Sequence, residues 1–307
     1  MSGVRAKGLE VISRFPWSVS VVAFMANPSV QRDPRALEDS LSTLTSDPVF
    51  DIVELHYMSE ELWKTAEPFL RKSRVDVIFG AQPLILSLGY NPSALEEGER
   101  RKAVEKLVEV VEVSAARGVK KVAFCSGRDP GAGDREAAKD SLVKSVKEVA
   151  VKAKKLGVTL ILETFDRNWD RRQLIGPLDE AVKVVEEVRN VYDNFGLLWD
   201  LSHAPMLDEK PSVLKKASGH LFHIHVGCCK RLPDGRLLDS HPGFYRPGAV
   251  NGVEEVAELL KVLHEIGYRG AIGFEVKPEE GQEWREPVEA AKSVLYTAFA
   301  KVLSGCL

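Results

Sequence analysis

Two histidines interrupt a short apolar run at residues 219–231, GHLFHIHVGCCKR. Charged or helix-breaking residues flank the apolar part on both sides, which predicts a buried strand. Residues two apart on a strand point the same way, so His223 and His225 share one face. Two imidazoles on one face can satisfy hydrogen bonds in a core or bind a metal ion, and the run by itself leaves both interpretations open.

Three other apolar runs carry one carboxylate each near their C-terminal ends. Carboxylates that converge on one point repel one another and raise one another's pKa unless a cation lies among them. Each carboxylate could instead cap a helix or pair with an arginine, but four strands that end in ligand-type residues favour one shared site. The three carboxylates are Glu163 in the run 158–166, Asp200 in the run 195–205 and Glu275 in the run 271–278.

One imidazole and three carboxylates would suit a divalent cation. Three oxygen donors and one nitrogen donor favour Mn²⁺, Mg²⁺ or Co²⁺ with positions left open for a substrate, and Zn²⁺ is also compatible. We expect Mn²⁺. Of the two histidines, His225 is the expected ligand because it lies nearer the C-terminal end of its strand. The predicted metal ligands are Glu163, Asp200, His225 and Glu275.

The elements that must position these residues alternate regularly from Trp17 onward. Eight predicted strands alternate with eight predicted helices, and the strands are apolar on both faces, as a closed parallel (β/α)8 TIM barrel of the α/β class requires. An open, doubly wound sheet is the alternative, but no strand is followed by a GxGxxG or GxxxxGK motif. No linker or shift in composition divides the chain. Residues 1–307 should therefore form a single domain, with residues 1–16 as an N-terminal arm.

Several local signals set the expected boundaries. Ser59 should cap the second helix, and Pro68 should kink or split it. The loop at 232–250 is too long to be a simple connector. Strands are expected at 18–28, 50–58, 75–83, 119–131 (with its loop), 158–166, 195–205, 219–231 and 271–278, and helices at 33–46, 59–73, 99–117, 134–156, 177–192, 211–217, 253–266 and 287–303.

Composition excludes several classes of partner. The formal charge is −3, which argues against a nucleic acid. No apolar run approaches the ~20 residues that span a membrane, and the N-terminus lacks the apolar segment of a secretory signal. The spacing of Cys125, Cys228, Cys229 and Cys306 fits neither a disulfide framework nor a zinc site, so we expect a reducing, cytoplasmic setting. The chain could form a homo-oligomer.

The motifs LETFD, WDLSH, HIHVG and GFEVKP, in this order over the last four strands, resemble the xylose-isomerase-like TIM-barrel superfamily. This superfamily contains sugar isomerases, sugar epimerases and endonuclease IV. In its ketose 3-epimerase branch, Glu, Asp, His and Glu at the matching positions hold the metal, and the resemblance implies the same four ligands here. It also implies that His203 of the DxxH motif and Arg231, six residues after the metal histidine, contact a sugar. Where the epimerases usually carry a further acidic residue, this chain has Trp169.

The last part of the chain also resembles a subgroup that includes C-glycoside-cleaving enzymes. In that subgroup a histidine recurs in the loop after strand seven, and a Lys-Pro pair follows the last glutamate. The resemblance implies that His241 is a second acid/base and that Lys277 contacts the substrate. A solvent-exposed loop histidine is the alternative interpretation of His241.

Together these features predict a metal-dependent sugar isomerase or epimerase with a small carbohydrate as its substrate. Glu163 and Glu275 would transfer a proton next to a carbonyl through an enediolate. Side chains from the first four strands, such as His56, Gln82 and Arg128, would set specificity. A lyase acting on a C-glycoside or 3-keto-sugar and a non-catalytic sugar-binding barrel are alternatives. An endonuclease IV-like enzyme would need histidines at 80–83 and 124–128, where this chain has none.

Overall fold

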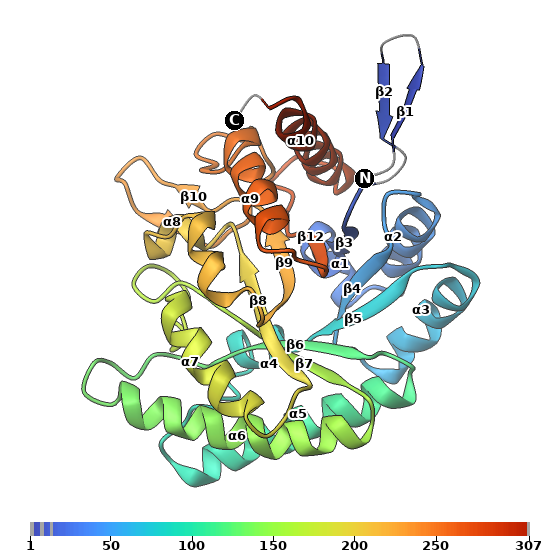
Figure 1. The fold of residues 1–307 in the computed structure, drawn as a ribbon. Helices are drawn as coiled ribbons and strands as arrows, with labels where there is room; N and C mark the ends of the chain where they lie inside the picture. The colour runs from blue at the N-terminus through green and yellow to red at the C-terminus, as the bar shows by residue number, and fades with distance from the viewer. Residues whose placement is uncertain (1–2, 7–8, 13–14, 306–307) are drawn as a thin grey trace.

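The computed structural model describes residues 3–6, 9–12 and 15–305. Eight parallel strands close into a barrel in the order β12-β3-β4-β5-β6-β7-β8-β9, and helices surround it (Figure 1). The predicted single-domain TIM barrel is therefore confirmed. The strands are β3 (Ser18–Val22), β4 (Ile52–His56), β5 (Asp76–Gly80), β6 (Lys121–Cys125), β7 (Thr159–Glu163), β8 (Phe195–Asp200), β9 (Leu221–Val226) and β12 (Ala271–Phe274).

The outer layer contains a helical segment after each barrel strand. Most predicted helices are present, but the one predicted at 211–217 is a 3-10 helix rather than an α-helix. The first strand is shorter than expected, because residues 23–26 turn into a short helix. The long outer segments are α2 (Pro34–Ser46), α3 (Glu60–Lys72), α5 (Glu97–Ala116), α6 (Arg135–Lys155), α7 (Leu178–Arg189), η2 (Pro211–Ala217), α9 (Val253–Glu265) and α10 (Arg285–Ser304); the short ones are α1 (Ala23–Ala26), η1 (Pro28–Gln31), α4 (Gln82–Leu86) and α8 (Ala204–Leu207).

The start of α3 follows the expected capping chemistry. The Ser59 hydroxyl accepts a hydrogen bond from the Leu62 N–H at 3.3 Å, and Glu60 and Glu61 place negative charge at the positive end of the helix dipole. Pro68 does not split the helix, which continues to Lys72.

The barrel strands are buried because helices cover their outer faces and side chains fill their interior. Every residue of β4 and of β8 is buried, including Glu54 and His56 of β4 and Asp200 of β8. A carboxylate or an imidazole in such a strand needs a partner inside the barrel. The polar residues that the strands carry therefore have to be explained by contacts with one another.

Two small hairpins lie outside the barrel. The antiparallel pair β1 (Gly3–Ala6) and β2 (Leu9–Ile12) projects away from the barrel (Figure 1). It falls in the predicted arm at 1–16, of which residues 1–2, 7–8 and 13–14 lie outside the described residues. The pair β10 (Lys230–Arg231) and β11 (Leu237–Leu238) gives structure to the long loop after β9.

Among the described residues, no helix is both long and apolar enough to cross a membrane. Cys125, Cys228 and Cys229 are buried free thiols, and Cys306 lies outside the described residues.

Candidate metal and substrate site

Four ligand-type side chains meet at the C-terminal end of the barrel. Glu163 and Asp200 are the last residues of β7 and β8, His225 is the next-to-last residue of β9, and Glu275 follows β12 directly. One ligand atom from each of the four lies within 4.8 Å of the others, and all four residues are buried. The parallel register of neighbouring strands brings residues far apart in sequence to one level of the barrel.

The environment of Glu163 suits a cation. Its Oε2 accepts a hydrogen bond from Gln82 Nε2 at 2.7 Å, whereas its Oε1 is buried and has no hydrogen-bond partner among the described residues. Burial and the Glu275 carboxylate raise the pKa of Glu163 to about 8. His225 Nδ1 lies 2.8 Å from Glu275 Oε2 and 3.9 Å from Glu163 Oε1, so its lone pair can face the same point. The donor set therefore fits a divalent cation.

A further carboxylate, Glu54 of β4, holds both histidines of the HIH motif. Its Oε2 lies 3.1 Å from His225 Nε2, and its Oε1 lies 2.8 Å from His223 Nε2. The Ser20 hydroxyl donates a third hydrogen bond to Glu54 at 2.6 Å. Burial raises the pKa of Glu54, but His223 and His225 outweigh burial and hold it well below its usual value. The two histidines thus share one face as predicted, while only His225 also reaches the carboxylate cluster.

The Glu54–His225 contact is the arrangement that metal-binding histidines need. A carboxylate that accepts the second ring N–H fixes the tautomer and the orientation of the imidazole and makes the other nitrogen a better ligand. The sequence interpretation missed Glu54, although a signal was present: it is a lone carboxylate inside the apolar strand at 50–58.

Gly273 of β12 leaves the space that this contact requires. A Cβ atom at this position would lie 2.6 Å from both Glu54 Oε1 and Ser20 Oγ, and 2.9 Å from His225 Cδ2. These distances are shorter than atoms in contact tolerate. The glycine therefore allows the polar side chains of β3, β4 and β9 to meet across the barrel.

Replacing Glu54 by glutamine should weaken metal binding by about 10- to 100-fold, because His225 loses the carboxylate that orients it. Calorimetric titration with Mn²⁺ measures this change directly. Glu105→Gln, on the exposed side of α5, removes the same charge far from the cluster and should leave the affinity unchanged. Equal affinities for Glu54→Gln and the wild type would contradict this role.

Asp239, in the loop after β11, joins two histidines and an arginine. Its Oδ1 lies 3.0 Å from His203 Nε2 and 2.7 Å from His241 Nε2, and its Oδ2 accepts a hydrogen bond from Arg171 Nε at 2.8 Å. Burial raises the pKa of Asp239, but the two histidines outweigh it and lower the pKa well below its usual value. Asp239 and Arg171 were not among the predicted site residues.

His241 lies inside the site, so the interpretation as a solvent-exposed loop histidine is wrong: its exposed fraction is 2%. The Lys277 N–H donates to its carbonyl oxygen at 2.7 Å, and its φ of 48° is uncommon for a residue with a side chain. Its Nδ1 has no hydrogen-bond partner among the described residues and lies 3.9 Å from Asp200 Oδ2. Burial lowers its pKa, but Glu275 and Asp239 outweigh it and raise the pKa to about 9.

His203 is a supporting residue rather than part of the pocket wall. Its Nδ1 lies 2.8 Å from the Thr164 carbonyl oxygen, and its Nε2 faces Asp239, so both nitrogens already have protein partners. His203 is not among the residues that line the inner pocket. His203 therefore positions Asp239 and, through it, His241.

The predicted substrate contacts divide into two groups. Gln82, the first residue of α4, lines the pocket beside Glu163. Arg231 and Lys277 do not: both are exposed, and neither lines the pocket. His56 is buried but packs edge-on against Phe24, with ring centroids 6.0 Å apart, and burial lowers its pKa to about 4. The structure thus brings Gln82, but not the other three, to the substrate space.

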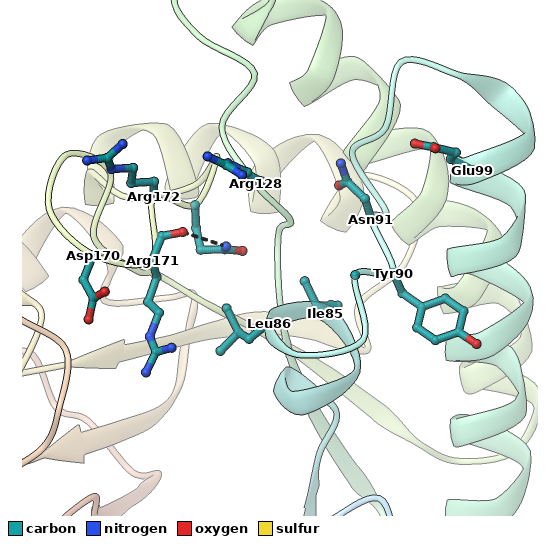
Figure 2. Close-up of a pocket in the computed structure, with 11 residues that line it drawn as sticks. Ile85, Leu86, Tyr90, Asn91, Glu99, Arg128, Asp170, Arg171 and Arg172 are labelled. Atoms are coloured by element: carbon teal, nitrogen blue, oxygen red, sulfur yellow. Dashed lines mark hydrogen bonds between the residues drawn. The ribbon is translucent and has the colours of Figure 1, made fainter.

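Three of the four candidate ligands, Glu163, His225 and Glu275, line an inner pocket of about 140 Å³. Phe24, Met25, Leu86 and Phe165 form part of its apolar wall, and Gln82, Asp239 and His241 are among its polar residues. A second cavity of about 530 Å³ adjoins it and shares Leu86 and Arg171 with it (Figure 2). Trp169 is 39% exposed and lines neither of these two spaces.

The sequence matches the profile of the xylose isomerase-like TIM barrel over residues 50–296. The chain belongs to this family. The match covers most of the barrel, including β4 to β12 and all the candidate ligands. The resemblance that the strand-end motifs indicated is therefore confirmed.

Two relatives within reach of sequence comparison act on sugars or sugar acids by name. The D-psicose 3-epimerase of Ruminiclostridium cellulolyticum is 28% identical over 143 residues, or 46% of this chain and 42% of that protein. The 2-oxo-tetronate isomerase of Haemophilus influenzae is 27% identical over 179 residues, or 57% of this chain and 63% of that protein. The matched stretches thus span less than two thirds of either relative.

Solved structures extend the likeness of fold to nearly the whole chain. The IolI protein, solved with a bound zinc atom, aligns with a TM-score of 0.72 at 19% identity and covers 93% of this chain and 99% of its own. At this identity the likeness concerns the fold alone.

Proposed function

We propose that the chain is a divalent-metal-dependent sugar isomerase or epimerase that transfers a proton next to a carbonyl. The observation that carries this proposal is the convergence of buried Glu163, Asp200, His225 and Glu275 within 4.8 Å at the barrel mouth. The names of the two relatives, an epimerase and an isomerase of sugar-type substrates, support the reaction class. The unpartnered Glu163 Oε1 supports a cation among these side chains.

The same four residues would hold the metal, and their three oxygen donors and one nitrogen donor favour Mn²⁺. A cation bound there would polarise the substrate carbonyl and acidify the neighbouring C–H. The protein contributes the orientation of the ligands through Glu54, Gln82 and Ser202, whose N–H donates to Asp200 at 2.8 Å. Burial excludes water from the groups that handle the proton.

Glu275 and Glu163 are suited to opposite halves of the proton transfer. Burial raises the pKa of Glu275, but His241 and His225 outweigh it and lower the pKa to about 2, so this carboxylate is ionised and can remove the proton. Glu163, in the same cluster, would be the second carboxylate, which returns a proton to the substrate. Return to the opposite face of the same carbon gives an epimer, and return to the neighbouring carbon gives an isomer.

His241 supports a second candidate activity on the same residues. Its buried Nδ1 faces the site with no protein partner, so it can donate a proton to a departing group. A lyase acting on a C-glycoside or 3-keto-sugar would need such a donor after the proton next to the carbonyl has been removed. Both activities begin with the same abstraction, and their products differ.

Solvent deuterium uptake tests the proposed function. The Mn²⁺-loaded protein is incubated in deuterated water with D-fructose, D-psicose, an inositol ketone or a 3-keto-glucoside, and NMR follows the proton next to the carbonyl. We expect exchange that chelation of the metal abolishes, with an epimer, an aldose or a released aglycone as the product. Binding of these sugars without exchange would favour a binding protein, and metal-dependent cleavage of abasic DNA would overturn the sugar assignment.

Metal affinity should rise with pH through the pKa of Glu163, about 8, and on through the raised pKa of His225. The pKa of Glu163 is raised to about 8 by burial and Glu275. Burial lowers the pKa of His225, but Glu54 and Glu275 outweigh burial and raise it well above its usual value. Below these values both groups carry protons that the cation must displace, so affinity falls by about tenfold per pH unit for each proton released.

Calorimetry with Mn²⁺ in buffers of different ionisation enthalpy counts the protons released. Glu163→Gln should release one proton fewer than the wild type near neutral pH, because glutamine has no proton to lose at this position. An affinity that does not change with pH, or a proton count that the substitution leaves unaltered, would contradict the raised pKa of Glu163.

A further inference from the structure

The outer cavity beside the metal pocket is larger than the inner one, about 530 Å³ against about 140 Å³. Residues after β5 and the start of α5 form one side of it, and the loops after β6 and β7 form the other (Figure 2). Leu86 and Arg171 line both spaces, so a molecule whose reacting end occupies the inner pocket can extend into the outer cavity.

Three arginines line this cavity, and two of them stand on loop segments that are joined by their backbones. Arg128 follows β6 and forms an antiparallel bridge with Gln173, the neighbour of Arg172. The Asp129 N–H donates to the Arg172 carbonyl oxygen at 2.8 Å, and the Gln173 side chain accepts from the Gly127 N–H at 3.0 Å. These bonds fix the spacing of the two arginines.

The turn that carries Arg172 is held in an unusual conformation. The buried Asp166 carboxylate accepts hydrogen bonds from the N–H groups of Trp169, Asp170 and Arg171. Arg172 then adopts a φ of 51°, a region that residues with side chains rarely occupy. Such conformations persist where the surrounding structure imposes them, and they concentrate at functional sites.

The charges of Arg128 and Arg172 are not balanced by neighbouring carboxylates. Among the described residues, neither guanidinium forms a salt bridge. The carboxylate next to Arg128 in the sequence, Asp129, pairs with Arg135 at 2.7 Å. Asp170, two residues before Arg172, accepts a hydrogen bond from the Asp239 N–H at 3.0 Å. The third arginine, Arg171, differs because Asp239 binds it.

The remaining carboxylate of the cavity is Glu99 on α5, and Figure 2 shows it beyond Asn91, away from the arginines. Asn91 Oδ1 is occupied by Ser93, so the amide nitrogen of Asn91 is left to donate. The arginine side of the cavity thus carries three arginines against one lining carboxylate, Asp170, and an excess of positive charge.

We propose that Arg128 and Arg172 bind an anionic group, a carboxylate or a phosphate, at the end of the substrate away from its carbonyl. This inference rests on the proposed function, because the inner pocket is taken to hold the carbonyl end. A planar guanidinium donates two parallel hydrogen bonds to a carboxylate or a phosphate, and two arginines on segments that are joined by their backbones favour such a group over a hydroxyl. The substrate class is therefore an acidic sugar derivative rather than a neutral monosaccharide.

Calorimetric titration of the Mn²⁺-loaded protein with matched ketoses tests the proposal. The probes are D-fructose, which is neutral, D-fructose 6-phosphate and the carboxylate 5-keto-D-gluconate. We expect at least one acidic probe to bind about tenfold or more tightly than D-fructose, since a hydrogen-bonded charge contributes at least this much. Which acidic probe gains most identifies the anion. Added salt should reduce the preference.

The variant Arg128→Gln/Arg172→Gln should lose this preference, so that it binds neither acidic probe more tightly than D-fructose. The variant keeps the metal ligands, so any effect of phosphate on the metal itself would appear equally in both proteins. Each single substitution should remove part of the preference, which provides a test that does not depend on the double variant. Arg269→Gln removes the same charge just before β12, at the opposite end of the barrel, and serves as the matched control.

Equal affinity of the wild type for all three probes, or a preference that the double variant retains, would overturn the proposal. Its failure is distinguishable from failure of the proposed function. The calorimetric titration measures binding of the acidic probes, whereas the deuterium-uptake experiment measures proton exchange. Arginine-dependent binding of an acidic ketose without any exchange would support the anion subsite and contradict the isomerase or epimerase activity.

Discussion

Glu275→Gln should abolish most proton exchange while the protein still binds Mn²⁺ and a keto-sugar. Glutamine preserves the length of the side chain and an oxygen donor, so it can still face His225 Nδ1, which lies 2.8 Å from Glu275 Oε2. Its amide cannot accept a proton at neutral pH. The loss of a positioned general base typically lowers a rate by about 10²–10⁴-fold, and we expect a decrease of this size.

The relevant comparison is between exchange rate and binding in the same samples. Deuterium incorporation next to the carbonyl gives the rate, and calorimetry gives the affinities for Mn²⁺ and for the sugar. Glu280→Gln is the matched control, because Glu280 is exposed five residues further along. An exchange rate close to that of the wild type would exclude Glu275 as the base. Complete loss of the metal would reduce its role to that of a ligand.

His225→Ala should lower Mn²⁺ affinity by more than about 100-fold, because losing a ligand should exceed the cost of losing a partner that only orients one. The substitution leaves three carboxylates facing one another without their nitrogen donor. It also removes one of the two imidazoles that hold Glu54. His223→Ala should behave differently and retain the metal, because His223 Nε2 faces Glu54 and not the carboxylate cluster.

Metal content after dialysis, measured by atomic absorption, separates the two histidines. The His223→Ala variant should lose about 1–3 kcal/mol of unfolding free energy, since the buried Glu54 gives up a hydrogen-bond partner. A thermal melt reports this cost independently of the metal. A metal-free His223→Ala protein together with a metal-bound His225→Ala protein would show that the ligand assignment is reversed.

The alternation of apolar strands and amphipathic helices was sufficient to predict the barrel. The periodicity of its own residues predicts each strand and each helix. Eight alternating strands and helices can form few folds other than a closed barrel. Because the C-terminal ends of all barrel strands meet at one mouth, the positions of Glu163, Asp200, His225 and Glu275 could also be predicted to converge. Periodicity predicted the ends of the strands less exactly, because residues 23–26, expected to continue the first strand, form a short helix.

Only the tertiary structure decided which loop residues reach the site. Arg231 and Lys277 follow strands that carry ligands, yet both side chains point into solvent, whereas Arg171 and Asp239 meet across 68 residues of sequence. Glu54 likewise meets His225 across 171 residues. Strand periodicity is a property of neighbouring residues and can be read locally. The direction of a loop side chain depends on hydrogen bonds to distant segments, which form only after the barrel has closed.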